Sequence, residues 1–138
     1  MNDDELRQAL SVLDIYNSQL ETFAQQAQIF RMSLEEALRA RETMKAFLAA
    51  KEGDDILVPV GASSFVPAKA SGNGMAIVGI GSRVSVEKDL NDAVSFMDET
   101  VKDISEALKK TSETAAETET NAKNLSMAIQ QEYQRRQQ

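Results

Sequence analysis

Residues 56–70, ILVPVGASSFVPAKA, decide the fold, because they are typical of β structure in a chain whose flanks are typical of helix. Val, Ile and Phe are frequent in the stretch, and the small residues at 61–64 are a turn signal between two short strands. Pro59 and Pro67 cannot donate to a β ladder, so they mark strand edges or bulges. The segment therefore predicts a β-hairpin inserted between two helical halves.

A second hairpin follows, because β-rich runs at 75–80 and 83–88 flank a glycine-containing turn or bulge signal at 79–81. Isolated hairpins are marginally stable in water, and apolar strands with open edges tend to pair with other chains. We therefore expect residues 54–88 to form an assembly module. The side chains expected to join subunits are Ile56, Val58, Val60, Phe65, Val66, Met75, Ile77, Val78, Ile80, Val84 and Val86.

The flank before this module has the seven-residue repeat of a coiled coil. Leu6 starts the series of a positions, the d positions three residues further on are also apolar, and Arg41 is the one break in this seam. Asn2 and Glu5 have the spacing of a capping box, and Gly53 supplies a stop at the C′ position. No Pro or Gly precedes Gly53, so we expect one uninterrupted helix.

The flank after the module repeats the pattern, with Leu90 as the first d position and Val94 as the first a position. Asp89 is placed to cap the start of this helix. Nothing breaks the helix before the last residue of the sequence. The polar positions along its seam are Thr111, Thr118 and Glu132.

The two flanks have similar lengths, which favours an antiparallel pair. We expect a mainly α fold: a long antiparallel coiled-coil helical hairpin with two short β-hairpins at the connecting end. A single domain, 1–138, would comprise a helix at 3–52, the hairpins at 54–88 and a helix at 90–136. The pairing would set small residues of the second helix opposite aromatic residues of the first, as bulky-against-small packing requires. The expected partners are Phe23 with Thr118, Phe30 with Thr111, and Leu20 with Ala122.

The composition excludes several classes of function. The chain has no Cys and no His, so disulfides, the common zinc sites and His-dependent nucleophiles are unavailable. The net charge of −7 repels phosphate backbones, so nucleic acid is not an expected partner. An acidic N-terminus and the lack of a long apolar run predict no signal peptide and no membrane span, and hence a soluble cytoplasmic protein. We expect no enzyme activity, no cofactor and no metal.

The glycine-containing stretches at 72–74 and 79–82 do not complete a phosphate-binding motif. No Walker-type run is present, and the chain continues as a strand where a dinucleotide motif needs a helix. We interpret these glycines as turn residues. Acidic pairs such as Asp54 with Asp55 lack the pocket that catalytic carboxylates need.

The middle of the chain resembles the double-hairpin segment of the archaeal-type prefoldin α-class subunit. That segment has a strand with L-V-P, a strand with V-P, and a strand with V-x-V-G-x-G that leads to V-E-K and a helix. The matching residues here are 57–59, 65–67, 79–81 and 86–88. The residues at 83–85, Arg-Val-Ser, depart from the aromatic residues that the family often has there.

The resemblance implies a partner and a function. Two α subunits would assemble with four prefoldin β-class subunits into a hexamer whose hairpins form a β-barrel body. The family acts as an ATP-independent holdase that captures unfolded proteins at the coiled-coil tips and delivers them to a group II chaperonin. A structural scaffold that oligomerises through its hairpins and binds one folded partner is the alternative.

Some apolar side chains near the free helix ends fall outside the seam, and these could bind unfolded clients. They are Leu10, Val12, Ile15, Met127 and Tyr133. Fraying of the ends would add seam residues to this surface. These are Leu6, Leu13, Leu125 and Ile129. Ile29, Met32 and Phe96 also lie off the seam, further from the ends, and single exposed apolar residues are ordinary on any protein surface.

Overall fold

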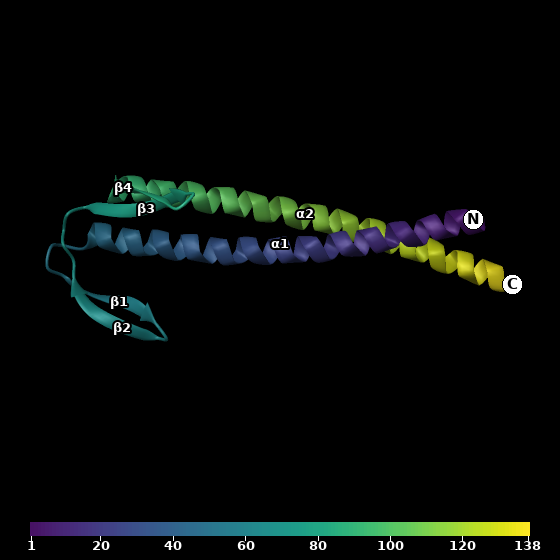
Figure 1. Cartoon of the computed structure of the whole chain (residues 1–138), viewed down its shortest axis with the longest axis horizontal. Helices are drawn as coiled ribbons and strands as arrows, with labels where there is room; N and C mark the ends of the chain where they lie inside the picture. Colours follow the sequence, from purple (N-terminus) through teal and green to yellow (C-terminus); the bar gives the residue numbers. More distant parts are fainter. The chain divides into compact units, whose positions relative to one another are not determined.

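The computed structural model describes residues 1–138, and its element order runs helix, two hairpins, helix (Figure 1). The elements are α1 (Asp3–Ala49), β1 (Asp55–Gly61), β2 (Ser64–Lys69), β3 (Met75–Gly81), β4 (Val84–Asp89) and α2 (Leu90–Gln137). The chain divides into two compact units: unit 1 comprises Met1–Ser33 with Ile104–Gln138, and unit 2 comprises Leu34–Asp103. The predicted fold class is confirmed, since two long helices carry two small antiparallel hairpins between them.

The heptad positions predicted from the sequence form the covered face of both helices. Buried residues on this face include Leu6 and Ala27 of α1 and Ala122 and Ile129 of α2. The exception is Leu48, which is 40% exposed one residue before α1 ends. A seven-residue apolar repeat therefore predicted correctly which side of each helix is removed from water.

Both predicted helix starts are confirmed by their hydrogen bonds. The Asn2 side-chain oxygen accepts from the Glu5 amide at 2.8 Å, and the Glu5 carboxylate accepts from the Asn2 amide at 3.0 Å, which completes the capping box. The Asp89 carboxylate accepts from the amide of Asn91 at 2.8 Å and caps α2.

The predicted end of the first helix is wrong by three residues. The helix ends at Ala49 rather than at residue 52, and Gly53 is not its C′ residue. Gly53 instead adopts a φ of 85° inside a turn that the Asp54 amide closes on the carbonyl of Lys51. The Gly53 amide donates to the carbonyl of Ala70 at 2.8 Å, so this glycine serves the base of the first hairpin.

In unit 1 the two helices run antiparallel. Arg136 near the end of α2 contacts Asp3 at the start of α1 at 2.7 Å. Further along, Phe23 lines the same hollow as Thr111 and Ala115, and this hollow has a volume of about 390 Å³. Small residues of α2 thus line one hollow with a bulky residue of α1, but Phe23 shares this hollow with Thr111, which was predicted opposite Phe30, and not with Thr118.

In unit 2 the two hairpins have the same strand register, and equivalent residues are 20 positions apart in the sequence. Asp55 pairs with Lys69 and Met75 pairs with Asp89, and the register shift lies at the same place in both hairpins, before Gly61 and before Gly81. The turns also match, because both central residues of each turn have positive φ, as in a type I′ turn. Those residues are Ala62 and Ser63 in one hairpin and Ser82 and Arg83 in the other.

Arg83 is a correction to the predicted strand at 83–88. It lies in the turn with a φ of 62°, and β4 begins one residue later, at Val84. The predicted turn signal at 79–81 lies just before this turn, whose place could not be read from its own residues, because type I′ turns usually carry Asn or Gly and this one carries Ser82 and Arg83.

The two hairpins differ in how their apolar faces are covered. In the second hairpin the Lys88 ammonium lies 5.6 Å from the ring centre of Phe96 on α2, so this face of β4 is turned toward the helix. Val78 shares that face and is 1% exposed. Its counterpart in the first hairpin, Val58, is 40% exposed. Val58 lines an open groove of about 550 Å³ between α1 and β1.

Gly81 and Gly79 offer a matched pair of substitutions that test the backbone conformation of the second hairpin. Gly79 and Gly81 both lie in β3, and a methyl group added to either would meet no atom within 4 Å. Only Gly81 has a positive φ, 113°, so Gly81→Ala should destabilise the hairpin by about 1 kcal/mol. Gly79→Ala should be neutral or slightly stabilising. Amide hydrogen exchange of β3 and β4 measures the difference, and equal exchange rates in the two variants would contradict it.

Candidate functional site

Unit 1 exposes apolar side chains at the end where both chain termini lie (Figure 1). All five off-seam residues predicted there are exposed, and we call them the terminal apolar set: Leu10, Val12, Ile15, Met127 and Tyr133. Ile15 is 54% exposed and lines a shallow hollow of about 350 Å³ together with Phe23. This hollow is shallow and open rather than an enclosed pocket, and Ile15 is the residue of the terminal apolar set that lines it.

The seam residues expected to join this surface are covered. Leu6 and Ile129 are buried, and Leu13 and Leu125 are half-buried. Single exposed apolar residues further along α1, Ile29 and Met32, are more exposed than any member of the terminal apolar set, whereas Phe96 on α2 is half-buried. The predicted binding residues therefore fall into two groups: the off-seam residues are exposed, and the seam residues are covered.

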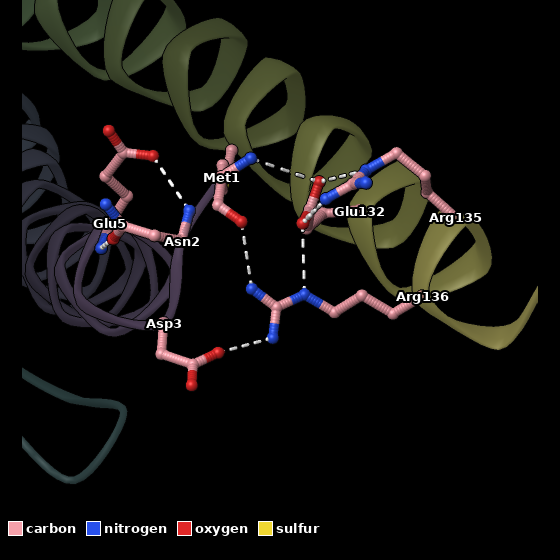
Figure 2. Close-up of polar contacts among 7 residues, drawn as sticks. All are labelled: Met1, Asn2, Asp3, Glu5, Glu132, Arg135 and Arg136. Atoms are coloured by element: carbon pink, nitrogen blue, oxygen red, sulfur yellow. Dashed lines mark hydrogen bonds and ion pairs between the residues drawn. The ribbon is translucent and has the colours of Figure 1, made fainter.

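A group of charges joins the helices at this end, and the sequence analysis did not anticipate it (Figure 2). We call it the terminal ion cluster: Met1, Asp3, Glu132, Arg135 and Arg136. Glu132 occupies a d position and is 6% exposed. Its carboxylate accepts from Arg135 at 2.6 and 3.1 Å and from Arg136 at 3.0 Å.

Arg136 is the residue that connects α2 to α1 in this cluster. One of its terminal nitrogens donates to the carboxylate of Asp3 at 2.7 Å, and the other donates to the carbonyl of Met1 at 3.0 Å. The Met1 amino group lies 3.5 Å from Glu132, a longer contact. Arg135, by contrast, bonds only within α2.

These contacts change the acidity of Glu132. The hydrogen bonds from Arg135 and Arg136 lower the pKa of the Glu132 carboxyl from 4.5 to about 2. Burial acts in the opposite direction but is the weaker effect. The hydrogen bond to Glu132 raises the pKa of the Arg135 guanidinium, and the hydrogen bonds to Asp3 and to Glu132 raise the pKa of the Arg136 guanidinium. Glu132, Arg135 and Arg136 therefore stay charged at neutral pH.

The hairpins carry the second predicted site. Most residues expected to join subunits are exposed in the single chain: Val58, Val60, Phe65, Val66, Met75, Ile77, Ile80 and Val84. Ile56 and Val86 are half-buried. Val78 is a correction, because this chain already covers it completely and it has no free surface to offer a partner. Leu57, which the prediction left out, is 66% exposed.

The free edges of the hairpins are not equivalent. The Ala70 amide donates to the Asp54 carbonyl, and the Leu90 amide donates to the Gly74 carbonyl, which fixes the alternation of hydrogen-bonded pairs along each ladder. Pro59 and Pro67 fall in pairs without ladder bonds, so each removes one outward-pointing donor from an edge of the first hairpin. The second hairpin has no proline and keeps all of its outward donors.

Comparison with known proteins identifies the family. The family model for prefoldin subunits matches residues 16–135. The chain belongs to the prefoldin family. Among curated relatives, it is 32% identical to the prefoldin subunit alpha of Pyrococcus horikoshii over 86% of this chain and 80% of that protein. It is 33% identical to the prefoldin subunit alpha of Nitrosopumilus maritimus, over 78% of this chain and 72% of that protein.

Solved structures agree with this prefoldin fold. A chain of the filamentous prefoldin from Methanocaldococcus jannaschii aligns with a TM-score of 0.69 at 20% identity, covering 85% of this chain and 97% of that one. The prefoldin beta subunit from Thermococcus strain KS-1 aligns with a TM-score of 0.59 at 17% identity, over 92% of this chain and 90% of that one. The relatives that match by sequence are alpha subunits, which confirms the predicted α class.

Membership of this family makes the chain a chaperone subunit that takes part in protein folding. Neither of its helices contains a stretch that is both long and apolar enough to cross a lipid bilayer.

The lowered pKa of Glu132 has a testable consequence. A carboxylate with a depressed pKa stabilises the folded tip fully above its unfolded value of 4.5, and this stabilisation is lost as the pH falls through about 2. In a carbon-detected NMR titration, the Glu132 carboxyl should titrate with a midpoint near 2. Replacing Arg135 and Arg136 with Gln should move that midpoint toward 4.5. A midpoint near 4.5 in the unchanged chain would mean that the contacts do not persist.

Proposed function

We propose that this chain is an ATP-independent holdase subunit of a cytoplasmic prefoldin, in which residues 1–138 act as a single domain. It assembles with prefoldin β-class subunits, two α with four β, and captures unfolded proteins at its helix ends for delivery to a group II chaperonin. The observation that carries this proposal is the terminal apolar set, which is exposed at one end of a helix pair that has no enclosed pocket.

The chemistry of this surface suits a client without fixed shape. Unfolded chains present apolar side chains in no set geometry, so a receptor for them needs apolar area and adaptable side chains rather than a shaped cavity. Met127 is flexible, and Tyr133 combines an apolar ring with a polar tip. The set is spread over two helices, which suits contact with an extended segment at several points.

The hairpins are proposed to join the subunits. The hairpins expose many apolar side chains at once, with Ile77 the most open at 77%, and two-stranded hairpins are only marginally stable in water on their own. A neighbouring chain that covered the exposed face of each hairpin would remove this surface from water. The second hairpin also offers complete edges to which another strand can add.

Substitution of the terminal apolar set tests the client-binding surface. Leu10, Val12 and Ile15 are exposed and outside the seam, so their replacement by Ser should leave the coiled coil folded. An assembly of this variant with a β-class partner should lose several-fold of its ability, without ATP, to suppress light scattering by a chemically unfolded protein. The measurement is scattering after dilution, with several unrelated test proteins.

A matched control for this experiment is the double substitution of Ile29 and Met32 by Ser. Both residues are exposed on the same helix of unit 1 but lie further from its end. This variant should hold clients as the unchanged chain does. Equal loss in both variants would show that general hydrophobicity matters and not the tip. An unchanged chain with no suppression would favour the scaffold alternative.

A charged residue placed on the exposed face of the second hairpin tests whether this face joins the subunits. Ile77→Asp should prevent the α–β complex from forming, because a carboxylate would have to be buried in an apolar joint. Ile29→Asp is the control, since Ile29 is similarly exposed but lies on α1 outside the hairpins. Light scattering gives the assembly mass, and circular dichroism should show unchanged helicity in both variants. Assembly of the Ile77→Asp chain at full size would rule out this face as the joint.

A further inference from the structure

The terminal ion cluster places an ionised group where the seam would ordinarily carry an apolar one. Glu132 continues the d series that begins at Leu90, and it lies one turn beyond Ile129, the last buried apolar residue of α2. On α1 the corresponding end of the seam is Leu6, which is also buried. Beyond Leu6 and Ile129 the seam therefore ends in charged residues rather than in another apolar layer.

A seam that ends in charged residues differs in stability and in salt dependence from one that ends in apolar residues. Well-packed apolar residues often stabilise as much as a buried ion network or more, because the charges must be taken out of water. Ion pairs that remain near water are also weakened by salt, which leaves apolar contacts in place. A seam that ends in charges can thus open under conditions that leave the rest of the coiled coil intact.

All of the charges that face Glu132 can be named. On its own helix they are Arg135 and Arg136, and from α1 they are the Met1 amino group and, through Arg136, the carboxylate of Asp3. The link between the two helices depends mainly on Arg136, because Arg135 makes no contact with α1. Arg136 is the side chain whose loss would separate the helix ends.

We propose that the terminal ion cluster is a latch that sets how much apolar surface the tip offers to non-native protein. When Arg136 holds Asp3 and Glu132 together, Leu6 and Ile129 are covered. When the contact opens, these two residues join the terminal apolar set as additional binding surface. The effect on clients rests on the proposed holdase function, whereas the opening itself does not.

The opening is measured by the distance between spin labels at Arg7→Cys and Gln134→Cys. Both positions are exposed and lie outside the seam, and the chain has no other Cys. In the full chain, Arg136→Gln should shift the distance distribution to longer values, with about a fivefold change in the ratio of open to closed tips. Glu132→Leu should narrow the distribution, because Leu at a d position extends the apolar seam.

Arg135→Gln is the matched control. It removes the same charge from the adjacent residue but breaks no contact with α1, so its distance distribution should lie much closer to that of the unchanged chain. Salt at 1 M should open the tip of the unchanged chain but not the Glu132→Leu tip. If Arg136→Gln leaves the distances unchanged, or if Arg135→Gln opens the tip equally, the latch does not exist.

Client holding is then measured with the same variants assembled with a β-class partner. Suppression of aggregation per mole should rise for Arg136→Gln and fall for Glu132→Leu. If the distances change as expected and suppression does not follow them, the latch does not regulate binding. If no assembly suppresses aggregation, including the unchanged one, the holdase function fails while the distance result still decides whether the tip opens.

Discussion

A pair of helices can cover only one stripe on each partner, and this limit determines where every other apolar side chain must lie. In unit 1 the heptad positions occupy that stripe, and no third layer shelters the residues outside it. A large apolar residue placed off the seam of unit 1 therefore stays in contact with water. Such residues are ordinary one at a time, and in unit 1 five of them gather near the chain termini, three on α1 and two on α2.

The same limit explains the hairpins. A two-stranded sheet has two faces and two edges, and a single helix can cover only one face. In the second hairpin α2 provides this cover, and Val78 is buried as a result. In the first hairpin the equivalent Val58 remains open beside the groove along α1, although the two hairpins share one register. The two hairpins therefore share one register but present different apolar surfaces.

Features with a local or periodic cause could be predicted from the sequence. The seam follows from a seven-residue repeat, and the caps at Asn2 and Asp89 follow from side chains that reach amides two or three residues away. The missed features depend on contacts distant in sequence or on unusual turn residues. Gly53 serves the base of a hairpin rather than the helix end, Arg83 occupies a turn without the usual Asn or Gly, and Val78 is covered by a helix that begins after the hairpin. From the sequence, Glu132 could be recognised only as a polar residue at a d position of the heptad repeat.

Glu132 lies within the match to the family model, residues 16–135, whereas Asp3 and Arg136, which connect the two helix ends, lie just outside it. The fold and the class of function follow from family membership, and the chemistry of the tip follows from its own contacts. A carboxylate that is 6% exposed at a d position needs hydrogen-bond partners to remain ionised. Because one of those partners, Arg136, also binds Asp3, the charge of Glu132 and the contact between the helix ends are linked through one side chain.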